Sequence, residues 1–198
     1  MKNTLFTEAI KVRDGELQNL SLHQKRIDEA LKSVGGETSI NLSKINIPTE
    51  HSQGMVKCRV VYSIDKVSVE FYPYTMRKIN SLKLVYCNQI DYPHKYADRS
   101  LLTELLLQKE GYDDILIIRN GYVTDTSFSN VVFENETGLF TPSTYLLNGT
   151  KRQYLLQIGK MQTTDIKAED IKHYNKIYLI NAMIELEDNI SIQTTEIY

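Results

Sequence analysis

The stretch from Ile115 to Glu134 reads ILIIRNGYVTDTSFSNVVFE and carries the strongest local structural signal in the chain. Two runs of strand-forming residues flank Asn120-Gly121, a pair that favours a two-residue hairpin turn because both residues tolerate positive φ angles. The stretch therefore predicts two antiparallel strands. Ahead of it, residues 100–108 are rich in leucine at helical spacing and end before Gly111, which predicts a helix.

The flanking segments continue this mixture of strands and helices. After Glu134 we expect a short strand in GLFTP, a helix that begins near Thr150 and a strand in KIYLINA. Before Ser100, residues 55–90 contain three β-rich runs, MVKCRVVYSI, KVSVEFYPY and SLKLVYC. Alternating apolar residues in each run predict an antiparallel meander of three strands.

The first 35 residues predict a strand, a turn at Asp14-Gly15, a second strand and a helix with Ser21 as its N-cap. The polar residues 37–53 predict a small helix and a loop. The sequence pattern changes near residues 91–95. We therefore predict an α+β fold of two lobes, with residues 1–92 in a small N-terminal lobe and residues 93–198 in a C-terminal lobe.

The composition narrows the classes of function. The chain has 198 residues with 23 basic and 25 acidic side chains and no long block of either sign, which argues against nucleic-acid binding. No run of 18 apolar residues and no signal-like segment is present, so we expect no membrane partner and a cytoplasmic location. Cys58 and Cys87 are expected to be buried free thiols, and the four histidines lack metal-ligand spacing, so no metal site is expected.

Four motifs, in order, resemble the class IV aminotransferases, which use pyridoxal 5′-phosphate and have the D-amino-acid aminotransferase fold. They are the segment HKYADR at residues 94–99, the Leu-rich helix after it, residues 119–134, and TPSTYLLNGTKR at residues 141–152. Residues 7–27 also resemble the first hairpin and helix of that family. The resemblance implies the two-lobed class IV fold in a short version, with the missing length in the first lobe.

The resemblance makes Lys95 the catalytic lysine, which forms the Schiff base with pyridoxal phosphate and then moves protons. Desolvation and neighbouring positive charge help such a lysine to lose its proton. Asp125 stands where the family usually has a Glu that pairs with the pyridine nitrogen and keeps it protonated. Because Asp is one methylene shorter, the ring must sit closer or a water must bridge. The alternative is that Asp125 is only a turn residue.

The same resemblance implies the other cofactor contacts. Backbone N–H groups at a helix N-terminus, together with a cation, suit a phosphate. The expected phosphate contacts are Arg26, Gly149, Thr150 and Asn181, and the residue expected under the pyridine ring is Leu147. Without the resemblance, Arg26 reads as part of a solvated helix face and Leu147 as core. Lys151 replaces a common Thr, so one hydroxyl contact is missing.

The residues Asn181-Ala182-Met183 bear on the reaction. Aminodeoxychorismate lyases of this family tend to have Asn-Ala-Leu or Asn-Ala-Met here, whereas the transaminases tend to have Gly-Thr-Ala. We therefore predict a 4-amino-4-deoxychorismate lyase that makes 4-aminobenzoate and pyruvate for folate synthesis, and the family resemblance implies a homodimer. The alternatives are an aminotransferase for branched-chain or D-amino acids and a degenerate, non-enzymatic pyridoxal-phosphate-binding protein. Arg59 either binds a carboxylate of the amino substrate or is an exposed strand arginine.

Overall fold

The computed structural model describes residues 4–37 and 40–198, which form two compact units. The first unit contains the chain up to Met76 together with His94–Asp98, and the second contains Arg77–Pro93 and Arg99–Tyr198. This division differs from the single boundary expected after residue 92. Residues 77–92 belong with the second unit, and the segment that carries Lys95 belongs with the first.

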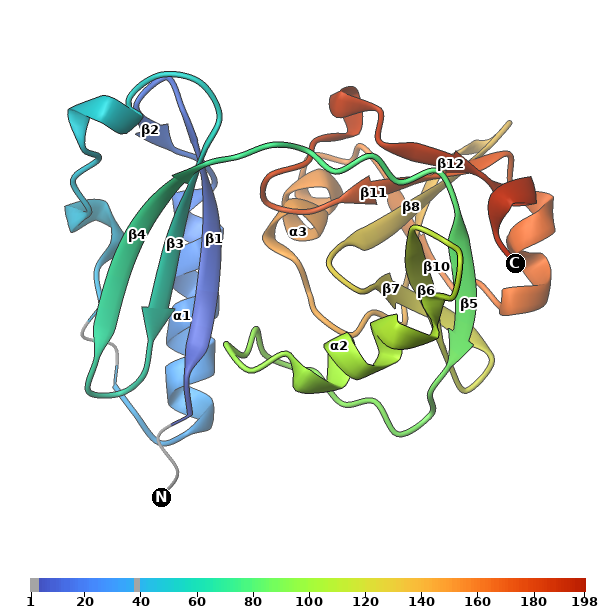
Figure 1. Ribbon diagram of the computed structural model, residues 1–198, viewed down its shortest axis with the longest axis horizontal. Coiled ribbons are helices and arrows are strands. Elements are labelled where there is room, and N and C mark those ends of the chain that lie inside the picture. Colours follow the sequence, from blue (N-terminus) through green and yellow to red (C-terminus); the bar gives the residue numbers. More distant parts are fainter. Residues whose placement is uncertain (1–3, 38–39) are drawn as a thin grey trace. The chain divides into compact units, whose positions relative to one another are not determined.

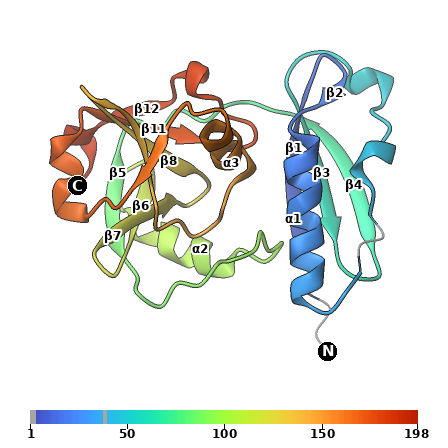
Figure 2. The same ribbon diagram turned by 180° about the vertical axis from the view of Figure 1, so that it is seen from behind.

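The first unit is an antiparallel sheet with a helix packed on one face (Figure 1, Figure 2). The strand order is β2-β1-β3-β4. The elements are β1 (Phe6–Arg13), β2 (Glu16–Leu17), α1 (Leu20–Ser33), β3 (Val56–Tyr62) and β4 (Val67–Pro73), with short 3-10 helices η1 (Leu42–Lys44) and η2 (Thr49–His51) between α1 and β3. Buried side chains of β1, β3 and α1, such as Phe6, Ile10, Ile27 and Val60, form its core.

Local signals predicted the first hairpin correctly but not the start of the helix. Asp14 and Gly15 both adopt positive φ angles, 52° and 75°, as the hairpin between β1 and β2 requires. The prediction of Ser21 as N-cap is wrong. Asn19 is the N-cap, with φ 52°, and its carbonyl oxygen accepts the backbone N–H groups of Leu22 and His23.

The segment His94–Asp98 extends the sheet of the first unit along β1. Thr7 N–H donates to the Lys95 carbonyl at 2.8 Å, and Ala97 N–H donates to the Leu5 carbonyl at 2.9 Å. Between these bonds, Phe6 lies opposite Tyr96, and the two rings stack with centroids 5.5 Å apart. The backbone of Lys95 is therefore fixed by β1.

The second unit is built on an eight-stranded sheet with the order β10-β9-β8-β7-β6-β5, in which β11 pairs with β8 and β12 pairs with β11 (Figure 1). The strands are β5 (Leu82–Tyr86), β6 (Asp114–Arg119), β7 (Tyr122–Thr126), β8 (Asn130–Asn135), β9 (Gly138–Pro142), β10 (Gln162–Thr164), β11 (Lys176–Ile180) and β12 (Ser191–Gln193). The helices are α2 (Ser100–Leu106) and α3 (Thr150–Gln157), with 3-10 helices η3 (Leu107–Lys109), η4 (Ala168–His173), η5 (Leu186–Asp188) and η6 (Thr194–Glu196).

Most predicted elements of the second unit are confirmed. Asn120 and Gly121, with φ angles of 52° and 82°, join β6 to β7, and α3 begins at Thr150. The three-stranded meander over residues 55–90 is wrong. β3 pairs with β4, but β5 pairs in parallel with β6 of the second unit. Alternation identifies a half-buried strand without identifying its partner, and Leu82 is buried in the core around β6 and β8.

A second apolar cluster fixes the position of α3. It joins Leu155 of α3 to residues of β8, β11 and η5, and its buried members are Val132, Leu155, Met161, Ile180 and Leu186. α3 is therefore packed beside the end of β11. Cys58 is a buried free thiol and Cys87 a half-buried one. Among the described residues, no helix is both long and apolar enough to span a bilayer.

Candidate functional site

Asp125 lies near the end of β7, just before the tight turn of residues 126–129 that leads into β8. Across this turn, Asn130 Nδ2 donates to Asp125 Oδ1 at 2.8 Å. The other oxygen, Oδ2, accepts the backbone N–H groups of Leu146 at 3.2 Å and Leu147 at 2.9 Å. Three amide donors thus hold the carboxylate, and no ion pair between residues of the described ranges includes it.

The surroundings of Asp125 raise its pKa above the ordinary value. Burial raises the pKa of Asp125 from 3.8 to about 6, against its bonds to Leu147, Asn130 and Leu146 and the charge of Arg152, which all lower it. A cation placed against the carboxylate would lower this pKa again and form a strong charge-assisted hydrogen bond. A protonated pyridine nitrogen is such a cation, so Asp125 fits the contact expected of it.

Asn130 joins Asp125 to the loop that enters α3. Its Nδ2 also donates to the Leu147 carbonyl at 2.9 Å, so both backbone groups of Leu147 are bonded to the Asp125–Asn130 pair. A Cβ on Gly149 would lie 2.1 Å from Asn130 Oδ1. Gly149 has ordinary backbone angles, φ −61° and ψ 143°, so this position requires glycine for space alone.

The start of α3 has the features of an anion site. Gly149, its N-cap, makes no side-chain capping bond, and the first-turn N–H groups of a helix have no acceptor within the helix. Thr150 is buried at the first helical position. Arg152 donates to Asn148 Oδ1 at 3.1 Å and to the Pro142 carbonyl at 3.0 Å, so its charge serves to fix the loop before α3.

Asn181 follows β11 and closes a tight turn. Its Oδ1 accepts the backbone N–H groups of Met183 at 2.8 Å and Ile184 at 3.1 Å. Its Nδ2 donates to the Phe128 carbonyl at 3.4 Å, in the turn between β7 and β8. Asn181 thus links the end of β11 to the turn next to Asp125, and its contact with a phosphate stays a prediction.

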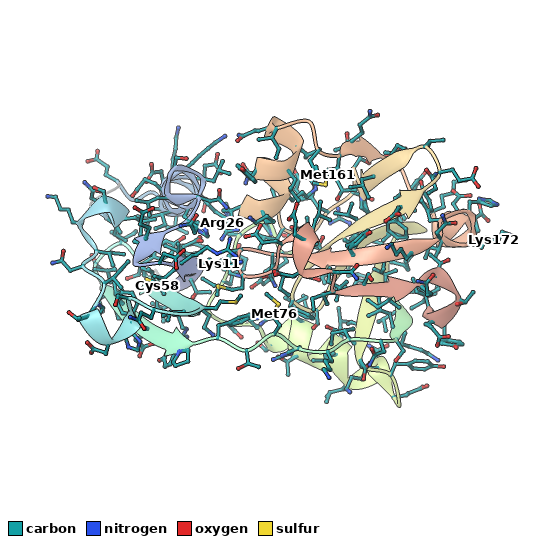
Figure 3. All side chains as sticks on the ribbon, turned by 90° about the horizontal axis from the view of Figure 1, so that it is seen from above. Lys11, Arg26, Cys58, Met76, Met161 and Lys172 are labelled. Atoms are coloured by element: carbon teal, nitrogen blue, oxygen red, sulfur yellow. The ribbon has the colours of Figure 1, made fainter. Side chains whose placement is uncertain are left out.

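In the first unit, Arg26 belongs to a buried cluster with Glu8 and His23. Arg26 extends from α1 towards the sheet (Figure 3), and its Nε donates to Glu8 Oε1 at 2.8 Å while its Nη2 donates to Oε2. His23 Nδ1 donates to the same Oε2 at 2.6 Å. All three side chains are buried, so the alternative of a solvated helix face for Arg26 is wrong. Its expected contact with a phosphate stays a prediction.

Charged partners offset the cost of burying the ionised Glu8 carboxylate. Burial alone would raise the pKa of Glu8, but the charge of Arg26 and the hydrogen bonds from His23 and Arg26 lower it to about 2. Burial lowers the pKa of His23, against its contact with Glu8, and the charges of Arg26 and Lys95 lower it further. Glu8 therefore stays ionised and holds the guanidinium of Arg26 in one orientation.

Lys95 is half-buried beside this cluster. Its carbonyl is bonded to Thr7, the residue before Glu8, and its charge acts on His23. The first unit thus brings Lys95 close to the Glu8–His23–Arg26 cluster. In the second unit, the expected contacts Asp125, Leu147, Gly149 and Thr150 lie together around Asn130.

Arg59 does not join either group of residues. It lies on β3, and its Nη1 donates to Glu70 Oε2 of β4 at 3.0 Å, in an exposed cross-strand pair. This geometry matches the alternative of an exposed strand arginine, and binding of a substrate carboxylate stays a prediction.

Sequence reasoning did not single out Glu8 and Asn130. Glu8 lies in a strand whose apolar neighbours Phe6 and Ile10 share its face, and a carboxylate on a core face signals a buried partner. Asn130 follows Asp125 by five residues across a turn, a spacing that gave no separate signal. Both are positioning residues: Glu8 orients Arg26, and Asn130 orients Asp125.

Comparisons with known proteins identify a family and structures with the same fold. The family model "Amino-transferase class IV" matches residues 5–187. An uncharacterized protein of Haemophilus influenzae is 36% identical over 180 residues, which are 89% of this chain and 96% of that protein. The crystal structure of a "putative 4-amino-4-deoxychorismate lyase" from Haemophilus somnus 129PT has a TM-score of 0.80 at 34% identity, over 92% of this chain and 98% of that one.

More distant structures share the fold. The branched-chain amino acid aminotransferase from Escherichia coli has a TM-score of 0.73 at 15% identity, over 93% of this chain and 75% of that one. The chain spans nearly all of the two Haemophilus proteins, so its short length relative to the Escherichia coli enzyme is shared with them.

Proposed function

The chain belongs to the class IV aminotransferases, a family of pyridoxal-phosphate enzymes that act on small molecules, and we propose that it is a 4-amino-4-deoxychorismate lyase. Its reaction would convert aminodeoxychorismate to 4-aminobenzoate and pyruvate, a step of folate synthesis. The observation that carries the cofactor assignment is the buried Asp125 carboxylate, which has amide donors alone within the described ranges and a pKa of about 6.

The proposal gives each residue a defined task. Lys95 would hold the cofactor covalently, and its amine, once free, would move protons. Asp125 would keep the ring nitrogen protonated, and Leu147 would contact the ring. When bound, the cofactor accepts electrons from a bond broken next to the substrate amine. The ring of the substrate would lose a proton and its C–O bond to the enolpyruvyl group would break, so that the ring becomes aromatic. The enolpyruvate that leaves takes up a proton and becomes pyruvate.

Each unit carries residues that we propose as phosphate contacts. In the first unit, Arg26 is the cation, and Glu8 and His23 fix its orientation. In the second, the first turn of α3 at Gly149 and Thr150 offers N–H donors, and Asn181 adds a contact. This fit depends on glycine at position 149, because a Cβ there would collide with Asn130.

The choice of lyase rests on the turn after β11. Asn181 accepts two backbone N–H groups and thereby closes the turn in the sequence Asn181-Ala182-Met183, which resembles the lyases of the family. The relative from Haemophilus somnus, at 34% identity, supports the same choice. The short first lobe also leaves less protein to recognise the oxo acid that an aminotransferase needs.

The deciding experiment is product analysis with cofactor-loaded protein. We expect 4-aminobenzoate and pyruvate from aminodeoxychorismate over many turnovers without any added oxo acid. An aminotransferase needs a second, oxo-acid substrate and follows ping-pong kinetics. Exchange of amino groups between an amino acid and 2-oxoglutarate, with no 4-aminobenzoate formed, would make the protein an aminotransferase for branched-chain or D-amino acids.

A separate experiment tests Lys95. Borohydride reduction of the loaded protein is expected to trap the cofactor on Lys95, as peptide mass spectrometry would detect. Trapping at another lysine in the Lys95→Ala variant would disprove the assignment. A protein that traps the cofactor on Lys95 but turns over neither substrate class would be the non-enzymatic binding protein.

The assembly and location are further proposals. Family membership supports a homodimer, which sedimentation equilibrium of the loaded protein would test. The cytoplasmic location expected from the sequence stays a prediction, and cell fractionation would test it.

A further inference from the structure

Lys151 is a buried cation at the start of α3 that the proposed function leaves without a task. It lies two residues after Gly149, and 4% of its side chain is exposed. Its ammonium group forms an ion pair with Glu185, and its Nζ also lies 5.2 Å from the centroid of the Tyr154 ring. Lys151 and Glu185 are 34 residues apart in the chain, so the ion pair joins two distant segments.

These two segments are the ones expected to hold the phosphate in the second unit. One is the first turn of α3. The other is the turn that Asn181 closes, and Glu185 follows directly after its last residue, Ile184. The backbone N–H of Glu185 donates to Asp188 Oδ2 at 2.8 Å, in a capping box that begins η5. Glu185 is therefore fixed on one side by η5 and on the other by Lys151.

A cation at this place has two possible tasks, and the contacts of Lys151 favour one of them. As a direct ligand, its ammonium would bind the phosphate and lose Glu185, which would leave a largely buried carboxylate beside a phosphate dianion. As a positioning residue, it would keep Glu185 and set the spacing between the two turns. The ion pair and the neighbouring Tyr154 ring describe an ammonium whose charge is already matched.

We propose that the Lys151–Glu185 ion pair is a clip that sets the spacing of the two phosphate-binding turns, so that Lys151 is a positioning residue and not a phosphate ligand. This inference rests on the proposed function, since it concerns the same cofactor site. The clip makes the site selective for the phosphorylated cofactor over pyridoxal, which lacks the phosphate.

The experiment measures the dissociation constants of pyridoxal 5′-phosphate and of pyridoxal for the full-length apoprotein by absorbance titration. Lys151→Met and Glu185→Gln are each expected to weaken pyridoxal phosphate about tenfold, because each breaks the same partly buried pair, and to change pyridoxal by less than about twofold. The double variant should lose no more than either single variant. Lys151→Arg, which keeps the pair, should restore most of the selectivity.

Control variants and alternative outcomes keep the two tasks apart. Lys167→Met and Glu169→Gln, which break an exposed pair of the same unit, should leave both dissociation constants unchanged. If Lys151 binds the phosphate directly, Glu185→Gln frees it, so that variant would bind pyridoxal phosphate more tightly and overturn the clip. Thermal melts of each apoprotein identify a variant that has unfolded. If Lys151→Met has unfolded, the selectivity of Lys151→Arg for pyridoxal phosphate over pyridoxal takes its place as the test of the clip.

The result for the unmodified protein separates this inference from the proposed function. If that protein prefers pyridoxal phosphate strongly and both single variants keep the preference, the clip is wrong and the cofactor site stands. If it does not distinguish pyridoxal phosphate from pyridoxal, the proposed cofactor site fails, and the clip fails with it.

Discussion

Glu8 in the first unit and Asp125 in the second are both buried carboxylates, yet their acid dissociation constants differ by several orders of magnitude. Glu8 has a pKa of about 2 and Asp125 a pKa of about 6. Burial raises the pKa of both groups, so burial does not cause the difference. Glu8 receives its hydrogen bonds from a guanidinium and an imidazole, whereas Asp125 receives its bonds from three amides.

The comparison distinguishes Glu8, a carboxylate with a charged partner in the structure, from Asp125, a carboxylate that has amide donors instead. Amide dipoles offset part of the cost of burying a carboxylate, but a positive charge offsets much more. Glu8 is matched by Arg26 and His23 within its own unit, and its task is to orient Arg26. Asp125 lacks such a match among the described residues, and in the proposed function the protonated ring nitrogen of the cofactor supplies it. Glu8 therefore has a structural task, and the task proposed for Asp125 is to bind a ligand.

The largest expected effect comes from removing the charge of the matched carboxylate. Glu8→Gln leaves Arg26 buried beside a neutral amide, so we expect the apoprotein to lose about 3–5 kcal/mol of stability in the first unit. Hydrogen exchange of β1 and α1 peptides, read by mass spectrometry, would localise the loss. The matched control is Glu70→Gln on the exposed pair with Arg59, for which we expect no measurable change. Equal protection in Glu8→Gln and the unmodified protein would refute the comparison.

The two carboxylates also predict opposite dependences on pH. Glu8, whose pKa falls on folding from 4.5 to about 2, stabilises the fold above pH 4.5, and this contribution is lost as the pH falls towards 2. Asp125, whose pKa rises on folding from 3.8 to about 6, contributes below pH 3.8, and this is lost as the pH rises through 6.

Denaturant unfolding of the apoprotein at several pH values would measure this difference. Between pH 4 and pH 7, the unmodified protein should lose about 2 kcal/mol of stability relative to Asp125→Asn, which cannot ionise. The Glu8→Gln variant should follow the unmodified protein above about pH 5.5, because Glu8 is then ionised in both the folded and the unfolded protein. A constant difference between Asp125→Asn and the unmodified protein would show that the pKa of Asp125 is ordinary.

The third effect concerns catalysis by the loaded protein. Asp125→Asn keeps the shape of the site but cannot hold the ring nitrogen protonated, so we expect turnover to fall about 100-fold, as for loss of one preorganised electrostatic contact. Retention of the cofactor after dialysis should change much less, because the phosphate contacts remain. Asp125→Glu, the usual residue of the family, is the control that should keep most activity. Unchanged turnover in Asp125→Asn would leave residue 125 as a turn residue only.

The sequence predicted the helices and strands of this fold better than it predicted which strands pair with one another. Asp14-Gly15 and Asn120-Gly121 determine their hairpins locally, because a two-residue turn needs positive φ angles that few residue pairs adopt. β5 was assigned to the wrong sheet, since its alternating pattern fits any half-buried edge. Asn19 was missed as N-cap because its backbone, without a side-chain bond, begins α1.

The candidate site shows the same limit at the level of side chains. The motif resemblance predicted Asp125, Leu147, Gly149 and Thr150, which the second unit brings together. It did not predict that Asn130 bonds to two parts of this group, because a contact between residues 130 and 147 depends on tertiary packing. Nor did it predict the ion pair of Lys151 with Glu185, since no local pattern relates residues 34 positions apart.

The smallest expected effect tests whether the geometry of Asp125 depends on its neighbour. In Gly149→Ala, the new Cβ would lie 2.1 Å from Asn130 Oδ1, so the Asn130 side chain must move and weaken its bonds to Asp125 and Leu147. We expect a loss of about 1–2 kcal/mol of stability, confined to β7, β8 and the loop before α3 in hydrogen exchange, with β1 and Glu8 unaffected. The pKa of Asp125 should rise further because one donor is weakened. The control is Gly111→Ala, where an added Cβ meets nothing within 4 Å. If the two variants behave alike, Asn130 is not fixed by Gly149, and the carboxylate of Asp125 does not depend on this packing.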